Sequence, residues 1–453
     1  MSKTKQLIAT QALAFAGQLL PAIVGVLSFM LLVRVATPIA LGEFVIYMAA
    51  VVLFEMVKSG GLQSAIVMRA ATGDSEARKK ITGSAYWLGG IFSISISIIL
   101  ATLYFSGVFE SQPGIAVFCG WYACLGIITL PLHIAEAEAV AAQQLQFLFW
   151  LRVAQSANAL LIAVYAYFTN GGLQQFATVH LIFTAVLLLV VLLLKKTHPQ
   201  YILHKTKEEV IKLFHLVKYS LATLATTNLL KTADTFLIGS LMGPASVAIY
   251  AIPLKLTELF EIPLRSLSTT AFPQMANNYN QKNTEGFRVN FTQYVSLAYL
   301  IYIPALIIAF IFAPYIVLII GGNKYADASN IFRVFILFGF FLPANRMTGI
   351  ALDAMQLPAK NFIKVLIMAI LNIVGDIIAI HYTKQLQWVA FISVLNAAVG
   401  AYIGWWLIKR STVFKNENIF SSVYKYCALF VKQIFAGRKL ISLGHQNGQR
   451  FIL

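Results

Sequence analysis

Residues 246–272 read SVAIYAIPLKLTELFEIPLRSLSTTAF, an apolar stretch that is long enough to cross a bilayer and yet contains four charged side chains. These are Lys255, Glu258, Glu261 and Arg265, whose spacing keeps all four within about a third of a helix circumference. An ionised side chain in hydrocarbon costs roughly 3 kcal/mol on insertion scales, so such groups persist only where they face water, a partner or a polar substrate. The stretch therefore predicts a membrane-spanning helix with one charged face.

Two further apolar stretches each contain a charged pair: residues 41–66 with Glu55 and Lys58, and residues 219–241 with Lys231 and Asp234. Charged groups inside membrane spans commonly mark substrate or ion pathways, because contact with lipid is too costly for them. The sequence thus indicates a membrane protein whose interior accommodates something charged or polar.

The composition is that of a polytopic membrane protein. Of 453 residues, 59% are hydrophobic and only 11% are charged, and the mean hydropathy is +0.77. A soluble domain carries about a quarter charged residues, and apolar runs of about twenty residues recur here along nearly the whole chain. The three cysteines show no metal-ligand spacing and no disulfide framework, and we expect neither a metal nor a cofactor. The basic start and the apolar run that continues to Val33 predict a first spanning helix rather than a cleaved signal peptide.

The apolar runs predict twelve membrane spans, and the predicted fold class is an all-α polytopic membrane protein. Several runs exceed the roughly twenty residues that a bilayer requires, so we expect tilted helices or helices that extend beyond the bilayer. The predicted spans are residues 8–33, 41–66, 82–107, 115–140, 147–168, 175–194, 219–241, 246–272, 291–319, 331–355, 361–381 and 387–408.

The basic residues of the loops are distributed asymmetrically, which predicts the orientation. If the N-terminus is cytoplasmic, that side receives nearly all loop lysines and arginines, whereas the other side receives only Arg34, Lys324 and Lys384. Lysine and arginine accumulate in cytoplasmic loops, so we expect both termini in the cytoplasm. The basic cytoplasmic loops explain most of the net charge of +17, so the charge does not require a nucleic acid partner.

The longest cytoplasmic loop divides the chain into two halves of six spans. The second span, FVIYMAAVVLFE, and the eighth, VAIYAIPLKLTE, share an Ile-Tyr pair and end on Glu55 and Glu258 at the same spacing. Because six is even, both halves enter the membrane from the same side, which predicts parallel repeats and a two-lobed transporter. The predicted parts are an N-terminal six-helix lobe at 1–194, a cytoplasmic linker at 195–218, a C-terminal six-helix lobe at 219–409, and a cytoplasmic tail at 410–453 in which residues 419–435 favour an interfacial amphipathic helix.

Two segments resemble a known family. In LLVRVATPIALGEFVIYMAAVVLFEMVKSGGLQSAIVMRAA, an arginine precedes a glycine-aromatic turn and a later Gly-Leu pair precedes another arginine; the residues are Arg34, Gly42, Phe44, Gly61, Leu62 and Arg69. The second segment, TNLLKTADTFLIGSLMGPASVAIYAIPLKLTELFEIPLRSLSTTAFPQMA, contains the Asp-Thr, Gly-Pro, Ile-Tyr and Phe-Pro elements at Asp234, Thr235, Gly243, Pro244, Ile249, Tyr250, Phe272 and Pro273. These elements resemble the polysaccharide biosynthesis and O-antigen-type flippases, which belong to a larger group that includes multidrug and toxin extruders.

The resemblance covers the twelve-span layout over residues 5–410. It implies two six-helix lobes that form a V around a central cavity, and passage of an undecaprenyl-diphosphate-linked oligosaccharide from the cytoplasmic to the external leaflet. Members of the family with fourteen spans exist, so the resemblance leaves the number of spans open.

Six basic residues are candidates for binding the diphosphate of such a substrate: Arg34, Lys58, Lys231, Lys255, Arg265 and Arg346. We prefer Arg265 and Arg346, because arginine presents a planar fork that matches phosphate oxygens. Arg346 also follows the helix-breaking Pro343, and a broken helix is tolerated in a membrane only where protein or water lines the break.

These basic residues also have ordinary structural explanations. Arg34 lies at a span end, where an arginine can extend to the lipid headgroups, and Arg346 can pair with Asp353. The four charges of residues 246–272 sum to zero and can compensate one another, and Lys231 can simply neutralise Asp234.

Four acidic residues are candidates for ion coupling: Glu55, Asp234, Glu258 and Asp376. Asp376, near Asn372, is a lone acid in its span and the best single candidate, although a hydrogen bond to a neighbouring helix would also explain it. His133 and Glu136 share a face of the fourth span, and such a titrating pair could carry protons.

These features predict a flippase rather than an enzyme, since the sequence contains no catalytic constellation. We expect a protein of the bacterial cytoplasmic (inner) membrane that works by alternating access on an undecaprenyl-diphosphate-linked oligosaccharide. Its other expected partners are membrane lipids, H⁺ or Na⁺ for coupling, and a polysaccharide polymerase.

Two other functions stay open at the level of sequence. A cation-coupled multidrug extruder would favour an acidic cavity and often an acid in the first span, and residues 8–33 contain none. A membrane-embedded glycosyltransferase or ligase typically carries a long external loop with catalytic residues, whereas the predicted external loops here are short.

Overall fold

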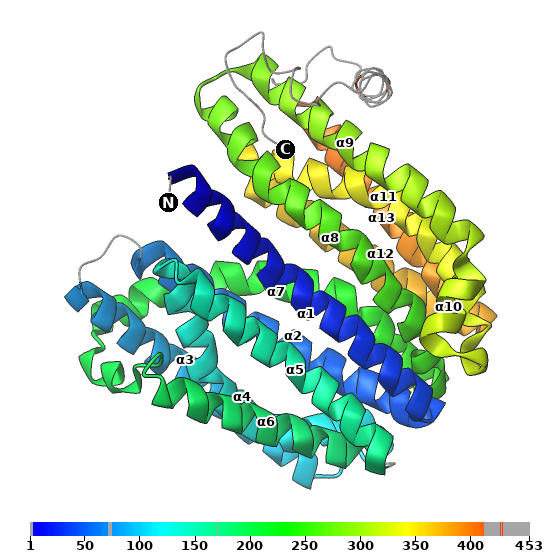
Figure 1. Ribbon diagram of the computed structural model, residues 1–453, viewed down its shortest axis with the longest axis horizontal. Helices are drawn as coiled ribbons and strands as arrows, with labels where there is room; N and C mark the ends of the chain where they lie inside the picture. The colour runs from blue at the N-terminus through cyan, green and yellow to red at the C-terminus, as the bar shows by residue number, and fades with distance from the viewer. Residues whose placement is uncertain (1–2, 71–74, 170, 412–425, 427, 429–453) are drawn as a thin grey trace. The chain divides into compact units, whose positions relative to one another are not determined.

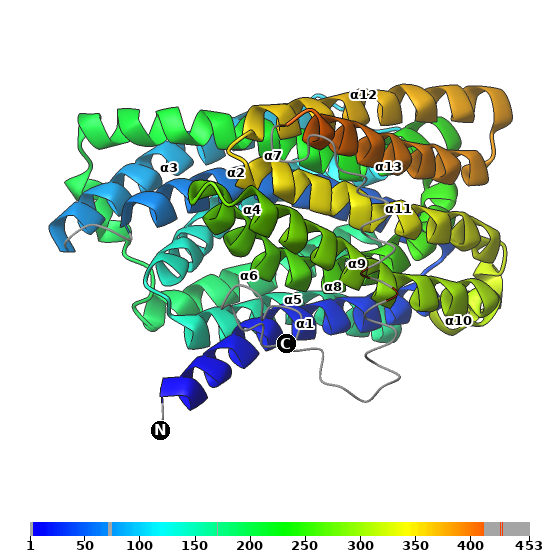
Figure 2. The same ribbon diagram turned by 90° about the horizontal axis from the view of Figure 1, so that it is seen from above.

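A computed structural model describes the backbone of residues 3–70, 75–169 and 171–411, together with 426 and 428. Every regular element in these ranges is a helix, which confirms the predicted all-α class (Figures 1 and 2). The amphipathic helix predicted for residues 419–435 falls almost entirely outside the described residues.

The described chain contains thirteen α-helices and two short 3₁₀-helices. Their bounds are α1 Lys3–Val35, α2 Pro38–Ala70, α3 Ser75–Phe105, α4 Pro113–Ala141, α5 Leu145–Thr169, α6 Leu173–Leu193, η1 Pro199–His204, α7 Lys207–Met242, α8 Pro244–Asn280, α9 Thr284–Ile311, α10 Ala313–Gly321, η2 Asn323–Tyr325, α11 Ala328–Ala354, α12 Pro358–Thr383 and α13 Leu386–Lys409.

Every predicted span corresponds to one of these helices, except that the predicted span 291–319 is divided between α9 and α10. The break follows Ile311, and Pro314 lies at the start of α10, where its missing N–H group cannot continue the hydrogen bonds of α9. Among the described residues, nine helices are long and apolar enough to cross a membrane: α2 to α6, α9 and α11 to α13. This protein is therefore a multi-pass membrane protein.

The chain divides into two compact units that do not follow the halves of the sequence. The first comprises Met1–Lys255, Val317–Ala328 and Asn372–Val389, and the second comprises Leu256–Ile316, Ser329–Leu371 and Ala390–Leu453. Short pieces of α8, α10, α12 and α13 thus belong to the same unit as the first seven helices. The six-and-six division into lobes remains a prediction about the sequence halves.

In the first unit, α2 lies at the centre and packs against α3, α4 and α7, while α1 packs along α5 (Figure 1).

In the second unit, α11 contacts both α9 and α13. Tyr299 of α9 lies against Phe340, and Thr348 lies close to Gly404 of α13. These contacts place α9 and α13 against α11, the helix that carries Arg346.

A glycine allows α2 and α8 to approach each other at their first turns. A Cβ atom added to Gly42 of α2 would lie 1.7 Å from the carbonyl oxygen of Pro244, the first residue of α8. No larger residue fits without moving one of the two backbones, which explains the glycine at this position.

We expect Gly42→Ala to lower the stability of the folded protein by about 1–3 kcal/mol, the usual cost of overpacking. Gly90→Ala on α3 is the matched control, because nothing lies within 4 Å of its added Cβ. Alanine is favoured over glycine in a helix by up to about 1 kcal/mol, so the control should keep or raise the stability. Thermal unfolding of both variants in detergent checks this, and equal unfolding temperatures would contradict the close approach.

Candidate functional site

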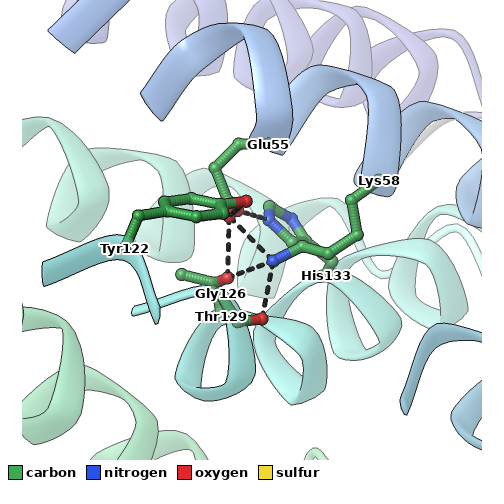
Figure 3. Close-up of polar contacts among 6 residues, drawn as sticks. All are labelled: Glu55, Lys58, Tyr122, Gly126, Thr129 and His133. Atoms are coloured by element: carbon green, nitrogen blue, oxygen red, sulfur yellow. Dashed lines mark hydrogen bonds and ion pairs between the residues drawn. The ribbon is translucent and has the colours of Figure 1, made fainter. Parts of the chain in front are cut away.

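A polar cluster joins α2 and α4 inside the first unit (Figure 3). The ammonium group of Lys58 donates to Glu55 Oε1 at 2.7 Å, to the carbonyl oxygen of Gly126 at 2.9 Å and to Thr129 Oγ1 at 2.5 Å. Its three hydrogens thus have three acceptors, and the residue is only 3% exposed. The predicted substrate ligand Lys58 is therefore fully engaged within the protein in this structure.

Glu55 lies at the centre of the same cluster and accepts hydrogen bonds from two more side chains of α4. The hydroxyl of Tyr122 donates at 2.6 Å and that of Thr129 at 3.0 Å, both to Oε1. His133 Nε2 lies against the other carboxylate oxygen, Oε2 (Figure 3). One carboxylate and one ammonium cancel, so apart from the histidine the cluster carries no net charge.

The proton-carrying pair suggested by the sequence, His133 with Glu136, is not formed. His133 contacts Glu55 of α2, while Glu136 accepts a hydrogen bond from Arg152 Nε of α5 at 3.2 Å. Residues one turn apart on a helix share a face, but here each finds its partner on a different neighbouring helix.

A second cluster joins the acids of α7 and α12 within the first unit. The amide nitrogen of Asn372 donates to Asp234 Oδ1 at 2.6 Å and to Asp376 Oδ2 at 2.8 Å, and the Tyr250 hydroxyl donates to Asp234 Oδ2 at 2.6 Å. Asp234 is 5% exposed and Asp376 is fully buried. In the described part of the chain, Asp376 Oδ1 has no hydrogen-bond partner.

Two of the predicted ion-coupling residues are thus brought together through one neutral amide. Two buried carboxylates this close repel each other when both are ionised, and a bound proton or cation relieves the repulsion. The sequence contained a signal for Asn372, which precedes Asp376 by four residues and therefore shares its helix face. Nothing local indicated that Asp234, on another helix, would complete the cluster.

The remaining candidates lie on helix surfaces. Arg34, Lys231, Glu258, Arg265 and Arg346 are exposed, and Lys255 is half-buried. Arg265 donates to Glu261 Oε2 of its own helix at 2.9 Å, which is one of the compensating pairs considered from the sequence.

Arg34 takes part in a reciprocal contact between helix ends. It donates to the carbonyl oxygen of Ile319 in α10, while Lys324 donates to the carbonyl oxygens of Arg34 at 3.3 Å and Ala36 at 3.0 Å. Each basic side chain thus satisfies carbonyl groups that a helix C-terminus leaves without partners.

The predicted residues are divided between the two units. Arg34, Lys58, Lys231, Lys255, Glu55, Asp234 and Asp376 belong to the first, whereas Glu258, Arg265 and Arg346 belong to the second. Within units, the structure brings together Glu55 with Lys58 and Asp234 with Asp376. The assignment of the ten residues to substrate and ion binding remains a prediction.

Structural comparison finds the fold in solved transporters. The chain is similar to a multidrug resistance MATE family transporter of the MOP superfamily in its inward-facing conformation, with a TM-score of 0.73, 16% identity, and coverage of 89% of this chain and 100% of that one. It is also similar to the lipid II flippase MurJ in an inward closed conformation, with a TM-score of 0.69, 15% identity, and coverage of 93% and 91%. A third similar structure is a MOP superfamily transporter from Pyrococcus furiosus, with a TM-score of 0.65, 16% identity, and coverage of 90% and 96%.

At these identities the similarity shows the fold alone, which is that of MOP superfamily transporters and flippases. A comparison with curated proteins gives no significant match. A family model described as "Polysaccharide biosynthesis protein" matches residues 31–330, about two thirds of the chain. The chain belongs to this polysaccharide biosynthesis protein family.

Proposed function

We propose that this protein is a flippase of the bacterial cytoplasmic membrane that moves a polyprenyl-diphosphate-linked oligosaccharide, such as an O-antigen or other surface polysaccharide repeat unit, from the cytoplasmic to the external leaflet. Membership of the polysaccharide biosynthesis family and the shared fold of a lipid II flippase support a lipid-linked sugar as the substrate class. The asymmetry of the loop charges supports cytoplasmic termini. A polysaccharide polymerase is the proposed partner on the external side.

The observation that carries the proposal is the exposure of arginine and lysine side chains on three long helices, of which α11 is apolar enough to cross a membrane. Arg346 lies within the membrane-spanning helix α11, and Arg265 and Lys231 lie on the long helices α8 and α7; all three are exposed. An exposed cation at membrane depth is stabilised by water or by an anion, because lipid is too costly for it. Glu261 already provides such an anion for Arg265, and Lys231 has interactions within the protein, so the proposal rests chiefly on Arg346. In this proposal, the diphosphate headgroup of the substrate is the anion that Arg346 binds.

The buried acids support ion coupling as part of the mechanism. Asp234 and Asp376 form the proposed coupling site, where H⁺ or Na⁺ relieves the repulsion between the carboxylates. The membrane potential acts in the same direction as the export of an anion, at about 2.3 kcal/mol per charge per 100 mV. With ion coupling and the membrane potential as driving forces, the proposed alternating access requires no ATP.

A cation-coupled multidrug extruder is the second candidate, and the MATE family fold favours it. The exposed basic side chains weigh against it, since they would repel cationic drugs.

Replacing either preferred arginine by glutamine should slow export. A hydrogen bond to a charged group contributes about 1.5–3 kcal/mol, so Arg265→Gln and Arg346→Gln are each expected to reduce the transport rate about tenfold to a hundredfold. Arg410→Gln is the matched control, because Arg410 is exposed at the end of α13 and stacks on Trp406.

The measurement is the appearance of the polysaccharide at the surface of cells that lack the chromosomal gene and carry each variant at equal protein level. Deletion alone should cause the lipid-linked glycan to accumulate on the inner leaflet. Unchanged surface polysaccharide after deletion, together with new sensitivity to cationic drugs, would support the extruder instead.

A further inference from the structure

A lysine that the sequence did not single out is buried between α11 and α12 of the second unit. Lys364 of α12 is 3% exposed, and its ammonium group donates to the carbonyl oxygen and to the side-chain oxygen of Asn345, each at 3.0 Å. Both acceptors are neutral. The charge of Lys364 is therefore hydrogen-bonded but not neutralised by these partners.

The only acid among the charged neighbours of Lys364 that the structure records in its described residues is Asp353, which also accepts hydrogen bonds from a neutral amide. The side-chain nitrogen of Asn361 donates to both carboxylate oxygens of Asp353, each at 3.0 Å. The other charged neighbour of Lys364 is Arg346, which follows Asn345 directly on α11 and is exposed. The group as a whole contains two cations and one anion, and so has a net charge of +1.

Such a group is costly in a membrane protein. A buried ammonium is normally paired with a carboxylate, and a second cation nearby raises the cost of keeping it charged. An anion that binds beside Arg346 would lower this cost for both cations. An anionic ligand would therefore stabilise this arrangement.

We propose that Arg346 and Lys364 form one anion site for the diphosphate of the lipid carrier, in which Arg346 contacts the phosphate oxygens and Lys364 acts from behind as a positioning residue. This inference rests on the proposed function and adds Lys364 to it. Lys364 holds the backbone of α11 next to Arg346 and contributes its charge to the field at the guanidinium group.

The packing around Lys364 keeps it in this supporting position. A Cβ atom added to Gly349 would lie 3.2 Å from Asn361 Oδ1 and 3.4 Å from Lys364 Nζ, so the absence of a side chain there leaves room for both groups. A Cβ atom added to Gly400 of α13 would lie 2.9 Å from Asn345 Oδ1. The acceptor of Lys364 is thus itself confined by a neighbouring helix.

The depth of the site suits a headgroup that enters from one leaflet. Arg346 precedes the end of α11 at Ala354, and Lys364 follows the start of α12 at Pro358. At 1.5 Å per residue, the two lie about 12 and about 9 Å from the connection between these helices. The loop charges predict that this connection is cytoplasmic, which is the side where the substrate is loaded.

The test is binding of undecaprenyl diphosphate to the purified full-length protein, measured by native mass spectrometry. We expect Arg346→Gln and Lys364→Gln each to weaken binding about tenfold or more, and Lys364→Arg to retain most of it because the charge is kept. Lys360→Gln is the matched control, since Lys360 lies one turn earlier on α12 and is exposed. Its affinity should equal that of the wild type.

A variant that is expected to strengthen binding makes the test independent of how well Lys364→Gln folds. Asp353→Asn removes the anion of the group while leaving an oxygen that can accept from Asn361, and it should tighten binding about threefold or more. Inorganic pyrophosphate is the second probe and should bind at least about tenfold more weakly than the lipid. Equal binding of pyrophosphate would assign the site to a free anion and overturn the proposal.

Two further outcomes separate this inference from the proposed function. If the wild type binds undecaprenyl diphosphate and Lys364→Gln binds it equally well, Lys364 is only structural and the inference is wrong, while the function stands. If Lys364→Arg loses as much affinity as Lys364→Gln, the effect comes from shape rather than charge, and the inference is again wrong. If the wild type binds no polyprenyl diphosphate, both the inference and the proposed substrate fail.

Discussion

Lys58→Met is expected to lower the free energy of unfolding by about 3–5 kcal/mol, the usual consequence of removing one partner of a buried ion pair. The substitution leaves Glu55 ionised inside the first unit with only neutral donors and His133 beside it. Thermal unfolding in detergent measures the effect. Among the substitutions discussed, this one should destabilise the protein most.

A double substitution provides the control for this prediction. Glu55→Gln combined with Lys58→Met removes both charges. Replacing both partners of a buried ion pair by uncharged residues often leaves the free energy of unfolding unchanged. We therefore expect the double variant to recover most of the lost stability. If Lys58→Met instead unfolds at the wild-type temperature and loses only substrate binding, Lys58 is a ligand and not part of an internal ion pair.

Asp376→Asn is expected to slow ion-driven transport strongly while raising the thermal stability in sodium-free buffer. Asparagine keeps the shape of the side chain but removes one of two neighbouring buried carboxylates, so the repulsion from Asp234 disappears. Gains in stability at the expense of activity are common at functional sites that store such strain. The expected loss of transport rate is at least about tenfold, equivalent to about 1.4 kcal/mol of barrier.

Proteoliposomes with imposed sodium or pH gradients check this prediction. Asp327→Asn is the control, because Asp327 is an exposed acid between η2 and α11 and should respond to the gradients like the wild type. A response of Asp376→Asn to both gradients equal to that of the wild type would remove the acid pair from the coupling mechanism.

The membrane spans were predictable from sequence because apolar runs of bilayer length have few other structural solutions. The division between α9 and α10 was missed, since an apolar run across Phe312 and Ala313 gives no hydropathy signal for a break. Only Pro314 indicated it, and prolines also occur inside helices of this chain, as Pro304 in α9 and Pro343 in α11 show.

From the sequence, the two polar clusters were predictable only where both partners lie on the same helix. Glu55 and Lys58 are three residues apart, so their pairing was one of two alternatives that the sequence offered. Tyr122 and Thr129 come from another helix, and no local pattern connects them with Glu55. Lys364 lies inside the predicted span 361–381, but no local pattern connects it with Asn345, which belongs to the preceding helix.

The central claim is that this protein moves a lipid-linked oligosaccharide across the bilayer, and the most direct measurement is translocation in proteoliposomes. Vesicles would contain the purified protein and an undecaprenyl-diphosphate-linked oligosaccharide, and an impermeant lectin would report how much glycan changes leaflet with time. We predict protein-dependent translocation that Arg346→Gln slows about tenfold to a hundredfold. Translocation at the rate of protein-free vesicles, with transport of a cationic dye by the same preparation, would contradict the claim.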